Sequence, residues 1–222
     1  MSKLYVVSTP IGNLGDITLR ALDVLREVNF IACEDTRRTS ILLNHFKIGG
    51  KKLLSYYEPK ESVQVPKILK LLEKESVALV TDSGTPSISD PGYRLIRACI
   101  DRGLPVEVIP GPSAVLTALV GSGLPTDRFL FVGFLPRKGL SNFLRKLQVY
   151  EDVTVIAFES PNRVVKSLGI MKEVYGDSIP FCVARELTKM HEEFVRGDLA
   201  YVLNELTERK EIKGELVVLW RL

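Results

Sequence analysis

One polar loop between a buried strand and a helix restricts the possible folds of this chain more than any other feature. Residues 77–80 form an apolar run short enough for a buried strand, and a helical pattern begins at residue 93. The loop between them holds two glycines, two prolines and several hydroxyl and carboxylate side chains. Ligands of open α/β sheets bind at the carboxyl ends of strands, so this loop predicts a site for a small polar cofactor.

Two other interpretations of the loop compete with cofactor binding. A helix start, with Asp90 as the N-cap residue and Pro91 at the first helical position, explains the end of the loop but not residues 82–87. The tetrad at 82–85 also fits the D-[ST]-G-[ST] pattern of aspartic proteases, which need two carboxylates sharing a proton. Those proteases are all-β proteins, whereas this chain alternates strands and helices, so the cofactor loop is the favoured interpretation.

The alternation of short apolar runs and amphipathic patterns continues along the whole chain and predicts the α/β class. We expect strands at residues 4–8, 30–33, 52–57, 77–80, 105–109, 129–134, 153–158, 179–184 and 214–222, with helices between them and a hairpin extension at 194–197. The glycine- and proline-containing segment 121–126 predicts a boundary between two α/β domains, 1–120 and 121–222.

Composition excludes several classes of protein. A content of 45% hydrophobic and 26% charged residues is typical of a soluble globular protein, and no apolar run is long enough to span a membrane. The first residues enter a strand pattern without a signal peptide, so we expect a cytoplasmic location. Three scattered cysteines predict neither a disulfide framework nor a metal site, and a net charge of +3 neither requires nor excludes a nucleic-acid partner.

Three further polar segments follow predicted strands. Residues 9–16 form a glycine-containing loop that lacks the Gly-Lys-Ser/Thr ending of a phosphate-binding Walker loop. Residues 34–38 combine acids and arginines, which suits either the rim of a site or a helix start with acids in its first turn. Residues 110–114 allow a ligand to approach the backbone closely, or else Ser113 caps the next helix.

The segment 185–193 is dense in ionisable groups. His191 and Glu192 resemble the start of a zinc-binding HExxH motif, but Val195 stands where the second histidine is needed, so we expect no metal. The segment is either a solvated hairpin with alternating charges or a substrate-binding loop that offers an acid, a base and cations together.

Seven motifs occur together and in order, at residues 10–16, 34–37, 82–92, 109–114, 131–136, 159–163 and 185–189. Through them the chain resembles the tetrapyrrole (corrin/porphyrin) methylase superfamily, in its branch that methylates small-subunit ribosomal RNA, over essentially its whole length. The resemblance implies two α/β domains with S-adenosylmethionine in the cleft between them, and a homodimer. It implies 2′-O-methylation of a cytidine in the decoding region of 16S rRNA.

The resemblance also implies roles for individual residues. The implied cofactor contacts are Pro10, Asp82, Gly84, Thr85, Ile88, Ser113, Ala114, Phe158 and Ala184. Methyl transfer from a sulfonium to a ribose hydroxyl is an in-line displacement that a general base or a nearby cation assists. We therefore expect Glu186 or His191 to take the proton, and Lys189 or Arg185 to steady the oxygen or a phosphate.

Binding of the RNA is expected to depend on basic side chains. Longer members of the family carry an additional C-terminal segment, whereas this sequence ends at Leu222 directly after its last predicted strand. The basic candidates are Arg37, Arg38, Arg137, Lys138 and Arg163. Two alternatives stay open: a methylase of a tetrapyrrole ring carbon, whose polycarboxylate substrate would also need arginine and lysine, and a non-catalytic module that binds the cofactor or RNA.

Overall fold

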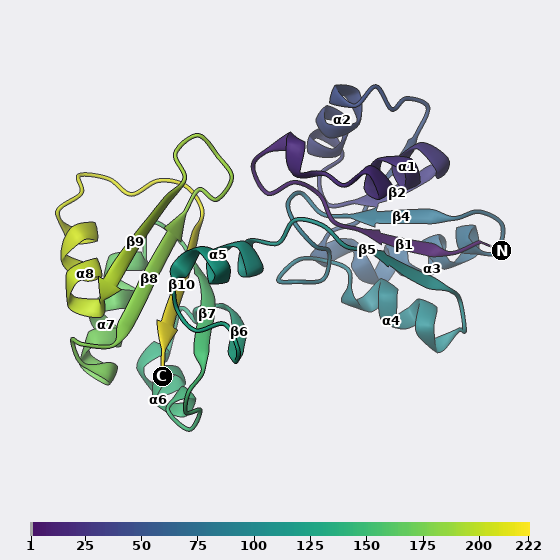
Figure 1. Ribbon diagram of the computed structural model, residues 1–222. Coiled ribbons are helices and arrows are strands. Elements are labelled where there is room, and N and C mark those ends of the chain that lie inside the picture. Colours follow the sequence, from purple (N-terminus) through teal and green to yellow (C-terminus); the bar gives the residue numbers. More distant parts are fainter. Residues whose placement is uncertain (1) are drawn as a thin grey trace. The chain divides into compact units, whose positions relative to one another are not determined.

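The computed structural model describes residues 2–222, which divide into two units, one ending at Ser113 and the other comprising Ala114–Leu222 (Figure 1). In the first unit, five short apolar segments form one fully parallel sheet in the order β3-β2-β4-β1-β5. Its strands are β1 (Leu4–Val7), β2 (Phe30–Cys33), β3 (Lys52–Ser55), β4 (Val77–Val80) and β5 (Val106–Ile109). Parallel strands with helical crossovers are buried on both faces, which explains their continuous apolar sequences.

Helices cover both faces of this sheet (Figure 1). They are α1 (Leu19–Glu27), α2 (Thr36–His45), α3 (Glu61–Leu72) and α4 (Tyr93–Asp101), with single 3-10 turns at Leu14–Asp16 and Glu58–Lys60. Alternate side chains of β1 enter different cores: Tyr5 and Val7 pack with residues of α1 and α2, while Leu4 and Val6 pack with residues of α3 and α4. The result is a doubly wound α/β layer structure.

The start of α4 differs from the expectation. Gly92, not Asp90, is the N-cap residue, and Pro91 lies outside the helix, so that part of the prediction is wrong. The backbone of Gly92 has a φ of +147°, which favours glycine, and its N–H donates to Glu61 Oε1 at 3.0 Å. The buried Glu61 carboxylate also accepts the hydroxyl of Tyr56 at 2.8 Å, so a residue distant in sequence fixes where α4 begins.

The second unit contains a mixed sheet in the order β6-β7-β10-β8-β9. Its strands are β6 (Phe129–Phe134), β7 (Thr154–Glu159), β8 (Pro180–Arg185), β9 (Glu193–Asp198) and β10 (Leu216–Arg221). β6 and β7 are parallel, whereas β10 runs antiparallel to both β7 and β8, and β9 pairs antiparallel with β8. The hairpin extension expected at residues 194–197 is thus confirmed as β9.

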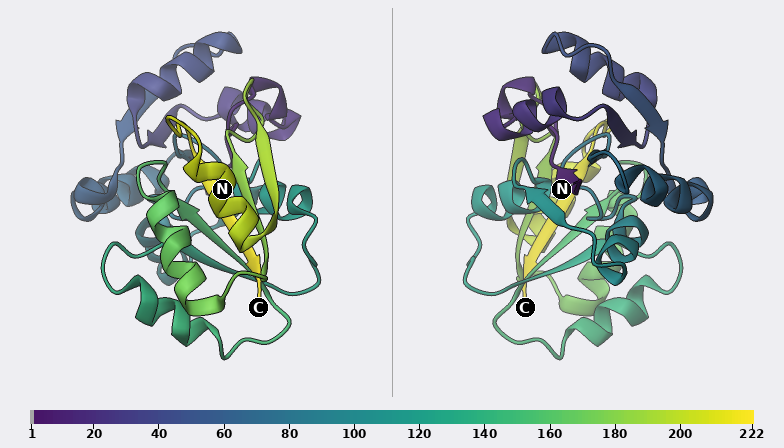
Figure 2. Two further views of the ribbon diagram at one scale, coloured as in Figure 1. Left: turned by 90° about the vertical axis from the view of Figure 1, so that its left-hand side faces the viewer. Right: turned by 90° about the vertical axis from the view of Figure 1, so that its right-hand side faces the viewer.

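Helices α6 (Leu140–Leu147), α7 (Val164–Tyr175) and α8 (Leu199–Thr207) pack on one face of this sheet, where Trp220 is fully buried. The left view of Figure 2 shows α7 and α8 lying in front of the strands. Helix α5 (Ala114–Ser122) packs against β8, β9 and β10 instead. Arg196 Nε donates to the carbonyl of Gly121 at 2.9 Å on the face that bears Phe194.

The observed boundary between the units differs from the predicted one because of how α5 packs. The sequence predicts domains 1–120 and 121–222, but the structure divides before α5 because this helix covers the sheet of the second unit. No helix among residues 2–222 is both long and apolar enough to cross a membrane. No cluster of three or more histidine, cysteine, aspartate or glutamate side chains suited to a metal occurs in the same residues.

Candidate functional site

The loops that follow β1, β2, β4 and β5 meet at one edge of the first sheet, because parallel strands place their carboxyl ends together. The loop after β4 is joined to the loop after β1 by two backbone hydrogen bonds: Thr9 N–H donates to the Gly84 carbonyl at 2.9 Å, and Gly84 N–H donates to the Thr9 carbonyl at 3.0 Å. Gly84 has a φ of +79°, a conformation that glycine adopts without strain. Two of the predicted cofactor loops are therefore bound to each other through their backbones.

A hydroxyl pair connects the third loop. Ser8 Oγ and Thr85 Oγ1 lie 3.0 Å apart, and Thr85 Oγ1 donates to the carbonyl of Pro112 at 3.4 Å. At Gly111, an added Cβ would lie 3.0 Å from Ser8 Cβ, so only glycine leaves the loops this close. The structure thus brings Thr85 together with the segment that leads to Ser113. Ser8 is a residue that the motif analysis did not single out; it is the last residue of the strand predicted at 4–8 and directly follows the observed β1.

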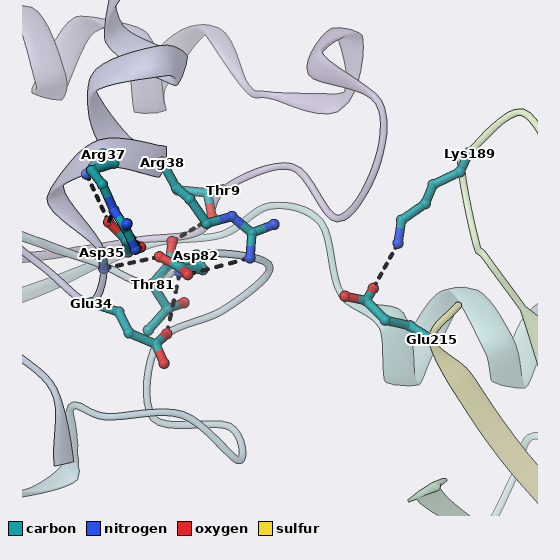
Figure 3. Close-up of polar contacts among 9 residues, drawn as sticks. All are labelled: Thr9, Glu34, Asp35, Arg37, Arg38, Thr81, Asp82, Lys189 and Glu215. Carbon is teal, nitrogen blue, oxygen red and sulfur yellow. Dashed lines mark hydrogen bonds and ion pairs between the residues drawn. The ribbon is translucent and has the colours of Figure 1, made fainter. Parts of the chain in front are cut away.

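Asp82 is the centre of a charged cluster (Figure 3). Its Oδ1 accepts the backbone N–H of Asp35 at 3.0 Å, and its Oδ2 lies 3.3 Å from Arg38 Nη1. The Asp82 N–H in turn faces Glu34 Oε2 at 3.5 Å. The motif at residues 34–38 therefore lies beside the cofactor loop predicted at residues 82–92.

The carboxylates of this cluster differ in their electrostatics. Burial, followed by the charge of Asp82, raises the pKa of Glu34. The hydrogen bonds from Arg37 lower the pKa of Asp35 to about 2. Asp35 is also the N-cap residue of α2, because its side chain accepts the Arg37 backbone N–H at 2.8 Å. A helix does start here, but Asp35 is its N-cap residue and its first turn contains no acid, while Glu34 lies directly after β2 at the edge of the sheet.

The other predicted cofactor residues of this unit flank the same loops. Pro10 is partly buried, in the loop that follows β1. Ile88 is 45% exposed, in a stretch where Ser87 and Ser89 have positive φ values of 75° and 61°. Strained non-glycine residues of this kind cluster at ligand sites. Ser113 ends the first unit and Ala114 begins α5 in the second.

In the second unit, Phe158 and Ala184 belong to one row of side chains across the sheet. Val217 of β10 lies between them in register, pairing with Phe158 on one side and Ala184 on the other. The row continues to Phe134 and Phe194 at its two ends. Phe158 contacts Phe134 edge to face, with ring centroids 5.3 Å apart. The row is apolar throughout; its Phe134 end is 62% exposed, whereas Val217 and Ala184 in its middle are buried.

The loop between β8 and β9 is closed by Glu186. Its Oε1 accepts hydrogen bonds from Lys189 Nζ at 2.9 Å and from the Glu215 N–H at 2.9 Å. Lys189 Nζ also donates to Glu215 Oε2 at 2.9 Å, the contact drawn in Figure 3. The hydrogen bond from Lys189 is the main cause of a lowered Glu186 pKa. Glu186 and Thr188 have positive φ values of 50° and 65°. These bonds stabilise a strained loop, and Glu215 is a member of the network that sequence reasoning missed.

The remaining residues of this loop differ in their contacts and exposure. Arg185 Nε lies 3.0 Å from Glu193 Oε2, and Arg209 Nη2 lies 2.6 Å from Glu193 Oε1. These arginines, Arg209 above all, lower the pKa of Glu193 to about 2. His191 and Met190 are exposed at the outer part of the loop, and Met190 is 93% exposed. Arg185 is thus engaged inside the unit, whereas His191 faces solvent.

The predicted RNA-binding cations also differ. Arg163 donates to the carbonyls of Leu135 at 3.2 Å and Pro136 at 3.0 Å, and it lies 3.3 Å from the buried Glu159 carboxylate. Its guanidinium therefore holds the turn after β6 in place. Arg137 and Lys138 in that turn are exposed, and within residues 2–222 neither forms an ion pair.

Arg37 and Arg38 are mostly exposed, although each lies near a carboxylate of the Asp82 cluster. Their positive charge is therefore partly offset locally, while part of each guanidinium remains accessible. Among the predicted RNA-binding cations, these four, two in each unit, are exposed enough to contact phosphates.

The chain belongs to the tetrapyrrole (corrin/porphyrin) methylase family, whose family model matches residues 3–202. Ribosomal RNA small subunit methyltransferase I of Hydrogenobaculum sp. (strain Y04AAS1) is 56% identical over 217 residues, covering 97% of this chain and 94% of that relative. The same-named protein of Thermotoga maritima is 46% identical over 219 residues, covering 98% and 97%.

Solved structures agree with this assignment of the fold. The uroporphyrin III C-methyl transferase of Thermus thermophilus aligns with a TM-score of 0.68 at 18% identity, covering 98% of this chain and 97% of that one. The tetrapyrrole methylase fold and the family resemblance predicted from the seven motifs are therefore confirmed.

Proposed function

We propose that this chain is an S-adenosylmethionine-dependent methyltransferase that 2′-O-methylates a cytidine in the decoding region of 16S rRNA. The observation that carries the proposal is the 56% identity to a relative named for small-subunit ribosomal RNA, over nearly the whole of both chains. The solved uroporphyrin III enzyme is only 18% identical, so it supports the fold but favours no tetrapyrrole substrate.

The cofactor proposal rests on the loops of each unit. In the first unit, Gly84 and Gly111 keep three loops close together, and the hydroxyl of Thr85 and the carboxylate of Asp82 lie at the same sheet edge. In the second unit, Phe158 and Ala184 lie in the apolar row. These residues suit a ligand that combines a flat adenine, a hydroxylated ribose and a charged amino-acid tail. The bound cofactor supplies an electrophilic methyl group, and the protein supplies orientation.

The remaining assignments of cofactor contacts stay within this proposal. Pro10 and Ile88 flank the loops of the first unit, and Ser113 and Ala114 lie where the two units join in sequence. Replacing Ile88 by a charged residue should weaken cofactor binding while leaving the fold intact, because its side chain is largely exposed.

The proposal assigns the RNA to the exposed cations. Arg37 and Arg38 in the first unit, and Arg137 and Lys138 in the second, are exposed enough to contact phosphates. Replacing Arg137 and Lys138 by alanine should weaken RNA binding and reduce its dependence on salt, with little change in cofactor affinity. Arg163 is assigned a structural role in presenting these two side chains.

The loop at residues 185–193 is assigned to substrate positioning. Glu186 is engaged by Lys189 and Glu215, which favours loop closure over proton transfer. Arg185 is held by Glu193, and His191 is the exposed titratable group of the loop. The proposal also includes a homodimer in the cytoplasm, and light scattering of the purified protein tests the oligomeric state.

The choice of acceptor tests the proposed function. The purified protein is incubated with methyl-labelled S-adenosylmethionine and either small ribosomal subunits that lack the modification or uroporphyrinogen III. The proposal predicts label in 16S rRNA and none in the tetrapyrrole. Label in the tetrapyrrole would show that the substrate is a tetrapyrrole and not RNA. Tight cofactor binding without transfer to either acceptor would indicate a non-catalytic binding module.

A further inference from the structure

We infer that Glu34 is the proton acceptor in the methyl transfer, and this inference rests on the proposed function. Glu34 directly follows β2, and its carboxylate faces the backbone of Asp82 at the start of the loop that follows the neighbouring strand β4. It therefore lies at the sheet edge where the predicted cofactor loops meet, next to the end of a strand of the sheet.

A comparison of carboxylates favours Glu34. Asp35 is held by Arg37 at 2.6 Å, and Asp82 is held by the Asp35 N–H and Arg38. Glu186 is likewise held by Lys189. Glu34 has only the 3.5 Å contact from the Asp82 N–H to its Oε2, and its Oε1 accepts no hydrogen bond from residues 2–222. A general base needs such a free acceptor oxygen.

The surroundings of Glu34 disfavour its charged form. Burial is the larger cause of its raised pKa, and the carboxylates of Asp82 and Asp35 add repulsion, while Arg38 and the Asp82 N–H oppose the shift. A carboxylate whose pKa is raised toward the working pH is a stronger proton acceptor than an exposed one. Carboxylates facing each other at strand ends also reduce stability, a feature typical of functional sites.

The proposed step balances as follows. The ribose 2′-oxygen forms a bond to the methyl carbon while the bond between that carbon and the sulfonium sulfur breaks, and the sulfur keeps the electron pair. The 2′-hydroxyl proton passes to Glu34 Oε1. The products are the 2′-O-methyl ribose, the neutral thioether S-adenosylhomocysteine and protonated Glu34, which returns its proton to water.

The test uses Glu34→Gln in the full chain, because the amide oxygen still accepts the Asp82 N–H but takes no proton. Single-turnover methylation of small subunits is measured from pH 5 to 9, and S-adenosylhomocysteine affinity is measured by calorimetry. We expect the rate to fall about 100-fold or more, the loss of activity at acid pH to disappear, and affinity to stay within about twofold of wild type. The control is Glu73→Gln, which replaces an exposed carboxylate at the end of α3. This variant should methylate the RNA at the wild-type rate.

The outcomes separate this inference from the proposed function. If wild type methylates the RNA and Glu34→Gln does so equally well, with the same pH profile, Glu34 is not the base. If His191→Ala alone removes the acid limb, the proton acceptor is His191. An equal loss of rate and affinity in Glu34→Gln would make Glu34 a cofactor-positioning residue. If wild type transfers no methyl to RNA, the proposed function itself fails.

Melting temperature gives a second readout. A raised folded-state pKa means that Glu34 stabilises the protein only at low pH and costs stability as pH rises through that pKa. Glu34→Gln should therefore melt at the same or a higher temperature than wild type at pH 7.5. A lower melting temperature with lost activity would indicate a structural role and overturn the inference.

Discussion

Asp82 and Asp35 are joined by a hydrogen bond of 3.0 Å from the backbone N–H of Asp35 to Asp82 Oδ1. The bond connects the ends of β4 and β2, which are neighbours in the first sheet. Because Asp35 is also the N-cap residue of α2, this one carboxylate fixes the loop predicted to bind the cofactor relative to a helix that carries Arg37 and Arg38.

Asp82→Ala should weaken S-adenosylhomocysteine binding by about 10- to 150-fold, since a hydrogen bond to a charged group contributes about 1.5–3 kcal/mol. Asp82→Asn keeps an acceptor for the Asp35 N–H and loses only the ion pair to Arg38, so its affinity should lie between those of Asp82→Ala and wild type. Calorimetry measures both, with exposed Asp101→Asn as the matched control. Equal affinity in Asp82→Ala and wild type would contradict the assignment of this loop.

Gly92→Ala should lower the free energy of unfolding by about 1–3 kcal/mol. Its φ is +147°, and an added Cβ would lie 3.1 Å from Ser87 N and 3.2 Å from Leu79 Cδ2. Gly49→Ala is the control, because nothing lies within 4 Å of its Cβ position and its φ is ordinary. Urea titration of both variants checks this, and indistinguishable midpoints would show that the loop relaxes without strain.

Glu193→Gln should reduce stability at neutral pH and reduce it less as the pH falls. The arginines lower the folded-state pKa of Glu193 from 4.5 to about 2, so its contribution is full above about 4.5 and is lost as pH falls toward 2. Because the side chain is about one-third exposed, we expect a difference of about 1 kcal/mol at pH 7. Thermal melts at pH 7 and pH 3 measure it, and a constant difference across this range would disprove the ion-pair explanation.

The three cysteines should react with a thiol reagent only after unfolding. Cys33, Cys99 and Cys182 are fully buried, and burial raises the pKa of each thiol to about 11. At pH 8 the thiolate, the reactive form, is about one part in a thousand. Reagent titration should find no rapid equivalents in the native protein and three in denaturant. Fast labelling of one native thiol would show that its core opens.

The sequence predicts most strands because each is a short apolar run bounded by polar or glycine-containing segments, as at residues 77–80. It misplaces the division between units because α5 is apolar on most sides, and such a pattern does not reveal which sheet it covers. It also misassigns the start of α4, since the deciding partner of Gly92 is Glu61, which lies 31 residues away in the chain.

The sequence predicts the motifs of the candidate site but not the hydrogen bonds that connect them. Local patterns identify residues 34–37 and 82–92 as polar segments after strands, yet only the strand order makes Glu34 and Asp82 neighbours. Likewise, Glu186 and Glu215 lie far apart in sequence, so the bond that engages the Glu186 carboxylate could not be foreseen.

The most direct test of the central claim is nucleoside mass analysis of 16S rRNA from modification-deficient small subunits incubated with the purified protein and S-adenosylmethionine. The account predicts a new 2′-O-methylcytidine, with the mass gain on the ribose fragment. Methylation on a base, or no methylated nucleoside while cofactor is still bound, would contradict it.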